Sequence, residues 1–468
     1  MGFLFWPMKL LFDIAGDLDT PVSAFMKLSA FQPCFLLESV EGGERLGRYS
    51  FLGLGEGLEV RLDRDGLWVG RERHAIPGSS AELLAALRQG LRCAPRPEPE
   101  IAGVPLAGGL VGYASYDAVR FFERLPARTG LESGVPILHY IAPRSLLVFD
   151  HVSRGIALLH DGSESERSSL RREVIRALRG GLPQVSRTGR YAAPVPSTTR
   201  EQHIAGIKRV KEYIAAGDVY QLVLSCRFAG QHELDPFQAY RALRLINPSP
   251  YMYYCSLGGV TVVGSSPEAL VKLKGRVAEL RPIAGTLPRA DDPAVDLARE
   301  AQLRADPKEN AEHVMLVDLA RNDLGRVARP GSIRVDPYRA IERYSHVMHI
   351  VSGVKGELAP ERDAFDLFAA SFPAGTLVGA PKVRAMQIID ELEPVSRGLY
   401  GGTVGYFGAR GDMDQAITIR TLVFRGDEYS YQAGGGIVAD SVPAAEHEEV
   451  LAKSAAVARA LEMAREGL

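Results

Sequence analysis

Two pairs of glutamates, each spaced i, i+3 on an expected helix, are the residues best suited to hold a metal ion. They are Glu309 with Glu312 and Glu446 with Glu449. In both helices apolar residues continue the acidic side, so we expect these carboxylates to point inward. Acids in such a position need a cation or a hydrogen-bond network. The pattern fits Mg²⁺, which takes carboxylates, water and an anionic substrate as ligands, although solvated helix faces paired with Lys and Arg have the same spacing.

Glycines and basic side chains supply candidate anion sites. Gly434, Gly435 and Gly436 follow an expected strand, where backbone N–H groups can approach a carboxylate; an ordinary tight turn or bulge is the commoner reason for such glycines. Arg420 alternates with apolar residues and suits either bidentate carboxylate binding or a structural salt bridge. His349 lies between apolar neighbours, where a satisfied core histidine is commoner than a reacting one.

The elements that must position these residues are short strands joined by hairpins, with helices between them. We expect strands at 58–62, 67–69, 145–149, 156–160, 219–228, 259–263, 270–273, 276–280, 402–407, 415–424 and 429–433. We expect helices at 81–92, 164–179, 204–214, 296–304, 309–321, 363–371, 381–391 and 446–466. Because the strands come in runs rather than in βαβ alternation, the pattern predicts antiparallel sheets with helices packed outside, an α+β fold.

Composition excludes several classes of protein. The chain has 468 residues, 46% hydrophobic and 24% charged, with net charge −2 and no basic stripe, which argues against a nucleic-acid partner. No stretch is long and apolar enough to span a membrane, and the apolar start, residues 1–12, lacks the marks of a signal peptide and is expected to be a first strand. Four isolated cysteines indicate reduced thiols in the cytoplasm. Residues 375–382 do not match a phosphate loop.

Composition also divides the chain into three regions, residues 1–160, a helix and linker at 161–199, and a motif-rich region at 200–468. Short stretches of the sequence carry a family resemblance: 217–225, 281–286, 311–318, 321–323, 346–352, 379–382, 400–406, 434–436 and 446–453. In this order they resemble the chorismate-utilising enzymes, most closely anthranilate synthase component I. The resemblance implies large antiparallel sheets packed as a sandwich, with a regulatory region before residue 160 and a chorismate-binding catalytic region after residue 199.

The resemblance also implies roles for individual residues. Glu312 and Glu449 would bind Mg²⁺, supported by Glu309 and Glu446. The residues that would hold chorismate are Tyr400, Arg420, Gly434, Gly435, Gly436, Lys453 and Gly285. Thr286 and Gln221 would lie at the reacting ring, and His349 would assist elimination of pyruvate.

Two positions indicate a choice within the family. Relatives that add water carry a lysine in place of Gln221, and glutamine cannot serve as the general base that water needs. Aminodeoxychorismate synthases often carry a nucleophilic lysine in place of Ala284. We therefore expect ammonia to attack C2 of chorismate as the C4 hydroxyl leaves, with pyruvate then eliminated to give anthranilate. Aminodeoxychorismate synthase component I, and a non-catalytic chorismate or tryptophan sensor, are the alternatives.

A second site is implied by resemblance to the family's tryptophan-binding element. Its expected residues are Glu38, Ser39, Ser50, Pro250, Tyr251, Met252, Val404 and Tyr406. Glu38 would pair with the amino group of tryptophan, and Pro250 with Met252 would contact the indole. Without the resemblance, the Glu38 segment is an ordinary strand and turn. The sequence shows no glutaminase nucleophile, so we expect a separate glutamine amidotransferase subunit, and feedback inhibition by tryptophan.

Overall fold

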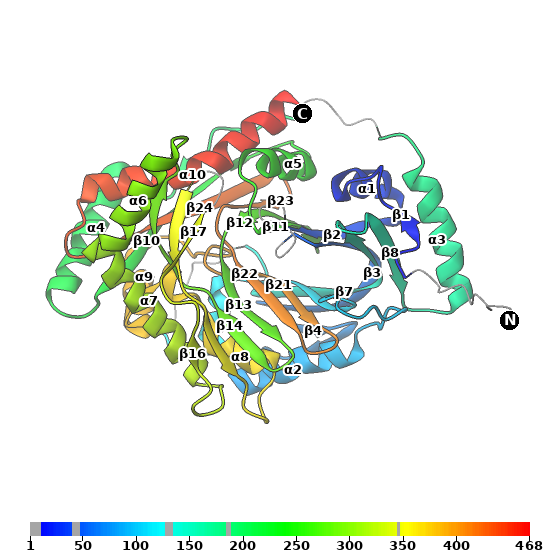
Figure 1. Ribbon diagram of the computed structural model, residues 1–468, viewed down its shortest axis with the longest axis horizontal. Coiled ribbons are helices and arrows are strands. Elements are labelled where there is room, and N and C mark those ends of the chain that lie inside the picture. Colours follow the sequence, from blue (N-terminus) through cyan, green and yellow to red (C-terminus); the bar gives the residue numbers. More distant parts are fainter. Residues whose placement is uncertain (1–10, 40–46, 127–133, 184–188, 344–346) are drawn as a thin grey trace.

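The computed structural model describes residues 11–39, 47–126, 134–183, 189–343 and 347–468, so residues 1–10 of the apolar start and His346 lie outside it. The described chain folds into long antiparallel strands flanked by helices, which confirms the expected α+β fold (Figure 1). All four cysteines are free. No helix within the described ranges has the length and apolar character needed to pass through a bilayer.

The first layer of strands carries residues from both ends of the chain. In spatial order its strands are β10 (Gln221–Gln231), β24 (Glu428–Ile437), β23 (Thr421–Arg425), β12 (Val260–Ser266), β11 (Tyr251–Leu257), β2 (Pro33–Glu38), β3 (Tyr49–Asp63), β7 (Leu138–Asp150), β8 (Gly155–His160) and β1 (Ile14–Ala15). Every neighbouring pair is antiparallel. Because β2 pairs with β11, the region before residue 160 and the region after residue 199 share one sheet.

A second layer begins where β7 also pairs with β6 (Gly109–Ala114). From β6 it continues through β21 (Thr403–Gly408), β22 (Met413–Ile417), β13 (Ala269–Lys274), β14 (Val277–Leu280), β19 (Val354–Glu357) and β16 (Arg334–Val335). In Figure 1 the orange β21 and β22 run between the cyan β7 and the green β13, so this layer too joins distant parts of the sequence. Near its edge β4 (Gly66–Val69) and β5 (Glu72–His74) extend from β3 as hairpins.

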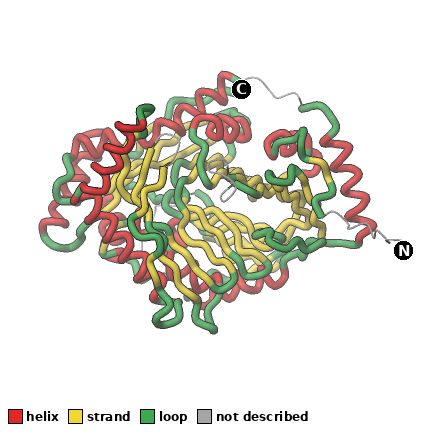
Figure 2. The backbone as a smooth tube through the Cα atoms, viewed as in Figure 1, coloured by secondary structure: helices red, strands yellow, loops and turns green. Residues whose placement is uncertain are grey.

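Apolar side chains fill the space between the two layers and the spaces under the helices. Phe35, Val111, Tyr253 and Val404 belong to the inner cluster, to which both layers contribute. A second cluster lies under α1 (Pro21–Lys27), α3 (Glu164–Leu178), α5 (Pro236–Ile246) and α10 (Pro443–Glu466). A third lies under α2 (Ser80–Cys93), α4 (Arg200–Ala215), α7 (Pro307–Gly325), α8 (Ala364–Ser371) and α9 (Lys382–Leu392). The molecule is therefore a sandwich of sheets with helices along its outside (Figure 2).

Local sequence explains why the helices begin where they do. Thr199 caps α4 in a capping box with Gln202, and Asp306 caps α7 by accepting hydrogen bonds from the first-turn N–H groups. Against α6 (Pro293–Ala305) and α7 lies a separate small sheet of β15 (Ile283–Pro288), β18 (Val347–Val351) and β17 (Ala340–Arg343). This small sheet carries Thr286 and His349, opposite each other in register.

Candidate functional site

Gly434 and Gly436 of β24 form a surface without side chains, here called the glycine floor, between two polar side chains. A Cβ at Gly434 would lie 2.6 Å from the Tyr400 hydroxyl, and a Cβ at Gly436 would lie 2.6 Å from Gln221 Nε2. A side chain at Gly434 would collide with Tyr400 and with the neighbouring strand, and one at Gly436 would displace the amide of Gln221. Tyr400 and Gln221 are both buried. The two glycines therefore form a strand surface without side chains, between a phenol and an amide.

The acids of α10 lie on the other side of the same strand. A Cβ at Gly435 would lie 3.3 Å from Glu446 Oε2. One helical turn later Glu449 forms an ion pair with Lys453 at 2.7 Å, and Lys453 Nζ also donates to the Gly434 carbonyl at 3.3 Å. The Glu449 and Lys453 side chains are 49% and 50% exposed, so the expectation that Glu449 points inward is wrong. The next residue of this helix, Val450, is buried in the core, whereas the Glu449 side chain is half exposed to solvent.

The acids of α7 face the floor from its other end. Gln221 Nε2 donates to Glu312 Oε1 at 3.2 Å, which joins this helix to β10. Burial raises the pKa of Glu309, and the negative charges of Glu312 and, more weakly, of Glu449 raise it further. The negative charge of Glu449 is the smallest of the causes that raise this pKa. Within the described ranges, no three His, Cys, Asp or Glu side chains converge as a preformed metal cage.

The small sheet places the hydroxyl of Thr286 and the imidazole of His349 beside the acidic side chains of α7. Thr286 Oγ1 lies 3.1 Å from His349 Nδ1, and the same nitrogen lies 3.0 Å from the Gly285 carbonyl. A hydrogen on Nδ1 donated to that carbonyl places the basic lone pair on Nε2. Gly285 has φ +67° at a bulge in β15, and a Cβ there would lie 3.1 Å from Glu309 Oε2. Thr286 and His349 therefore belong to the same site as the acids.

Arg420 lies in a turn, so the single strand expected at 415–424 is wrong. The chain leaves β22 after Ile417 and enters β23 at Thr421, and Arg420 between them has φ +50°. The hydroxyl of Thr418 donates to the Leu399 carbonyl, which binds this turn to the one that carries Tyr400. Arg420 Nη1 donates to Asn247 Oδ1 at 3.3 Å. No glycine or proline marks this break, which is why periodicity alone missed it.

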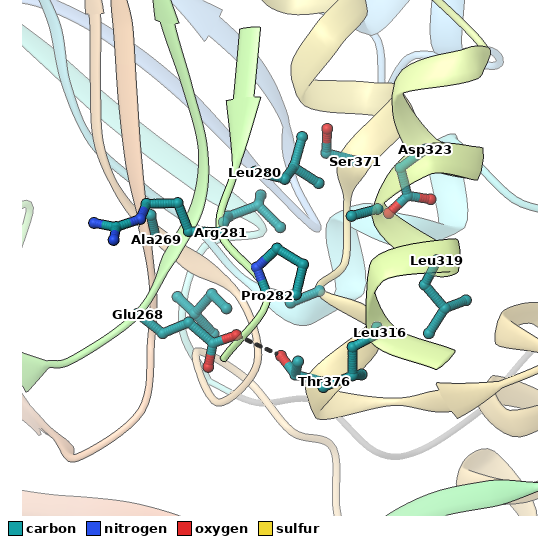
Figure 3. A pocket seen from close by; sticks show the side chains of 15 residues that line it. Glu268, Ala269, Leu280, Arg281, Pro282, Leu316, Leu319, Asp323, Ser371 and Thr376 are labelled. Carbon is teal, nitrogen blue, oxygen red and sulfur yellow. Dashed lines mark hydrogen bonds between the residues drawn. The ribbon is translucent and has the colours of Figure 1, made fainter. Parts of the chain in front are cut away.

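Glu268 is a candidate proton donor that the sequence analysis missed. It lines a cavity of about 40 Å³ together with Leu316 and Leu319 of α7. Its carboxyl accepts a hydrogen bond from Thr376 Oγ1 at 2.9 Å (Figure 3). Burial raises the pKa of Glu268 to about 7. An acid directly after Pro267, between two apolar strands, is the signal that could have identified it.

A second cavity, of about 860 Å³, lies between the two strand layers and contains the expected tryptophan element. Its lining includes Glu38, Ser39, Pro250, Tyr251, Met252, Val404 and Tyr406. Its volume falls in the range of small-molecule sites. Ser50 does not line it: this side chain is fully buried and hydrogen-bonded to His151 Nε2 at 2.7 Å. The structure thus brings together all of the expected residues except Ser50.

The polar groups of this cavity differ from expectation. Glu38 accepts hydrogen bonds from Arg244, at 3.1 and 3.2 Å, and from Tyr240, so its carboxylate already has protein partners. Ser39 Oγ is buried and has no hydrogen-bond partner among the described residues. Tyr251 donates to Asp414 at 3.0 Å. Ser39 is therefore a polar group of this cavity that is open to a bound molecule, beside the partnered carboxylates of Glu38 and Asp414.

Comparison with known proteins gives one consistent family. The family model described as chorismate binding enzyme matches residues 32–459. Anthranilate synthase component 1 of Thermus thermophilus is 45% identical over 97% of this chain and 97% of its own length, and that of Pseudomonas aeruginosa is 44% identical over 98% and 96%. The crystal structure of anthranilate synthase component I from Streptococcus pneumoniae is similar with a TM-score of 0.79 and 32% identity, covering 95% of this chain and 98% of that one. The menaquinone-specific isochorismate synthase of Escherichia coli, at 20% identity, 95% and 91% coverage and a TM-score of 0.69, shares the fold.

Proposed function

This chain belongs to the anthranilate synthase component 1 family of chorismate-binding enzymes, and we propose that its glycine-floored site aminates chorismate at C2, releases the C4 hydroxyl and eliminates pyruvate. The observation that carries this proposal is the placement of Tyr400 and Gln221 over Gly434 and Gly436, with Glu312 of α7 bonded to Gln221 and Glu446 of α10 against Gly435. The site thus offers anion-binding groups and carboxylates to one bound molecule. The product is anthranilate, a precursor of tryptophan.

The four glutamates fit Mg²⁺ as the metal of this site. They are oxygen donors, and the raised pKa of Glu309 reflects burial and charge repulsion from Glu312 and Glu449 that a divalent cation would relieve. We propose Glu312 and Glu449 as the ligands, with Glu309 and Glu446 beside them. Mg²⁺ commonly keeps waters and takes one or two carboxylates, so a complete protein cage is not required. When bound, it supplies Lewis-acid stabilisation of negative charge on the substrate.

The remaining side chains bind the substrate and move protons. Tyr400, Lys453 and Arg420 hold the carboxylates of chorismate against the N–H groups of the glycine floor. Gln221 has no basic atom, and its buried Oε1, without a partner in the described part of the chain, can accept a hydrogen bond from ammonia. Glu268 gives a proton to the departing hydroxyl.

Elimination of pyruvate follows amination in the proposal. His349, steadied by Gly285 and Thr286, takes the ring proton at Nε2 as the enolpyruvyl group leaves. Thr286 contacts the ring from the same side. Loss of that proton and the side chain makes the ring aromatic.

One assay tests the proposed function against its alternatives. We expect the pure chain to convert chorismate, with Mg²⁺ and ammonium, into equal amounts of anthranilate and pyruvate. Fluorescence measures the anthranilate. Amination without pyruvate would instead indicate aminodeoxychorismate synthesis, and turnover without ammonium would indicate addition of water. A chain that binds chorismate and releases no product would be a sensor. Ala284 and Gln221 are the residues that favour the first outcome.

We also propose that an amidotransferase subunit supplies the ammonia, since the chain shows no glutaminase nucleophile. The pure chain should then work with ammonium salts and show no turnover with glutamine. Glutamine-dependent turnover of the single chain would contradict the proposal. The reduced cysteines favour action in the cytoplasm.

Feedback inhibition by tryptophan is proposed for the second cavity. Asn247, which leads into the Pro250–Met252 wall, binds Arg420 of the chorismate site, so a ligand on that wall can bias the position of Arg420. Ser39→Ala should raise the tryptophan concentration for half inhibition about tenfold, since a hydrogen bond to a charged group contributes about 1.5–3 kcal/mol. Activity without tryptophan should stay unchanged.

Steady-state rates over a tryptophan titration measure this effect. Ser256→Ala is the matched control, because Ser256 is an exposed serine of β11 bonded to Thr261 outside the cavity. Equal inhibition of Ser39→Ala and wild-type protein would remove Ser39 from the site. Undiminished turnover of the wild-type protein in millimolar tryptophan would remove the inhibition itself.

A further inference from the structure

A buried ion pair lies directly behind the glycine floor. Arg397 Nε donates to Glu393 Oε2 at 2.9 Å and its Nη2 donates to Glu393 Oε1 at 2.7 Å. The two side chains are 0% and 1% exposed. Taking both charges out of water is expensive, and such a pair is often no more stabilising than apolar residues of similar size. Overall stability alone is therefore a weak reason for its presence here.

The guanidinium of Arg397 ties the turn of Tyr400 to two other segments. Its Nη1 donates to the Leu377 carbonyl at 2.7 Å, and its Nη2 donates to the Val223 carbonyl of β10 at 2.8 Å. The ring of Tyr400 lies over the same guanidinium, with 5.5 Å between Cζ and the ring centroid, and the Tyr400 N–H donates to the Arg397 carbonyl at 3.0 Å. Both the backbone and the ring of Tyr400 are thus placed by Arg397.

The carboxylate of Glu393 binds Ser225 of β10, the strand that pairs with the glycine floor. Its Oε1 accepts hydrogen bonds from the Ser225 N–H at 2.9 Å and from Ser225 Oγ at 2.7 Å. Ser225 Oγ in turn accepts from Gln432 Nε2 at 2.7 Å. Ser225 pairs with Gly434 in the sheet, and a Cβ at Gly434 would lie 2.9 Å from Ser225 Cβ. Glu393 therefore fixes the strand pair that carries the floor.

We propose that the Glu393–Arg397 pair is a positioning device, which sets the Tyr400 hydroxyl over Gly434 at the distance that the substrate carboxylate requires. This inference rests on the proposed function. Neither charge touches the substrate; the pair acts through Tyr400 on one side and Ser225 on the other. A misplacement of a binding group by about 1 Å can lower a rate about 100-fold, which sets the size of the expected effect.

The test is a double-mutant cycle between the pair and Tyr400. Replacing both charges, Glu393→Leu with Arg397→Met, should lower kcat/KM for chorismate about 100-fold while the thermal midpoint stays within several degrees of wild type. Tyr400→Phe should lower kcat/KM in the wild-type background and have little further effect in the double-variant background. Equal factors in the two backgrounds, or unchanged kcat/KM in the double variant, would overturn the proposal.

Two further variants keep the result interpretable. Arg397→Lys preserves the charge but cannot form the forked contacts with Glu393, Val223 and Leu377, so it should lose most of the same activity even if the apolar double variant folds poorly. Arg88→Met removes the forked pair with Asp363 between α2 and α8, far from the floor in the fold, and should leave kcat/KM unchanged. Calorimetry of chorismate binding to the same proteins gives the coupling between the pair and Tyr400 without any turnover. If the wild type makes no anthranilate, the proposed function fails, but this binding cycle still tests the positioning role.

Discussion

Glu312→Gln is expected to lower kcat for ammonium-dependent anthranilate formation about 10³-fold, the scale of losing a contact that stabilises charge in the transition state. The amide keeps the size of the side chain and its contact with Gln221, but it removes one negative charge from the proposed Mg²⁺ site. Glu449→Gln should act in the same direction. Both variants should also bind Mg²⁺ at least about 100-fold more weakly. Activity measured over a Mg²⁺ titration, with calorimetry of Mg²⁺ binding, reports both quantities.

The neighbouring residue on α10 provides the control for Glu449. Glu448 is 63% exposed and faces Arg200 at 3.8 Å, so Glu448→Gln removes the same charge without touching the site. It should leave the Mg²⁺ titration unchanged. If Glu448→Gln and Glu449→Gln shift the titration equally, the effect is general electrostatics and Glu449 is not a ligand. If Glu312→Gln keeps wild-type turnover, α7 does not hold the metal.

Much of the fold was predictable because strand periodicity and caps are local properties. The capping box of Thr199 and the hairpin of β3 with β4 follow from a few adjacent residues. The partners of those strands do not. The pairing of β2 with β11, and of β6 with β21, joins segments hundreds of residues apart in the chain, and no local pattern specifies it.

In the candidate site too, residue types were predictable from the sequence, whereas their surroundings depend on contacts between distant segments. The glycines were recognisable as a type, but their reason is the close approach of Tyr400 and Gln221, which only the folded chain shows. Arg420 was placed on a strand because its neighbours alternate, and the contact of Thr418 with another loop broke that strand. Glu449 was expected inside because helical spacing gives a side of the helix but not its surroundings. Helical spacing therefore does not predict whether an acid such as Glu449 is buried or exposed when its helix lies at the surface.

The second large effect is expected at Glu268. Glu268→Gln should lower kcat about 10²- to 10⁴-fold, the usual contribution of a general acid, because an amide cannot give a proton to the departing C4 hydroxyl. KM for chorismate should change little, since the amide retains the hydrogen bond from Thr376. Steady-state kinetics with ammonium measure the two constants separately. Glu279→Gln is the control, because Glu279 is a strand residue, 31% exposed, whose ion pair with Lys355 lies outside the cavity.

The pH dependence gives an independent test of the same carboxyl. With its pKa raised to about 7 by burial, Glu268 is protonated at pH 6 and loses the proton as pH rises, so kcat should fall through pH 7 at constant free ammonia. The protonated state also stabilises the fold: the native chain retains a proton that the unfolded chain releases near pH 4.5, so stability declines from there toward pH 7. Glu268→Gln should remove both the kinetic limb and this decline. If the kinetic limb survives in the variant, another group supplies the proton, and Glu268 is only a buried acid beside α7.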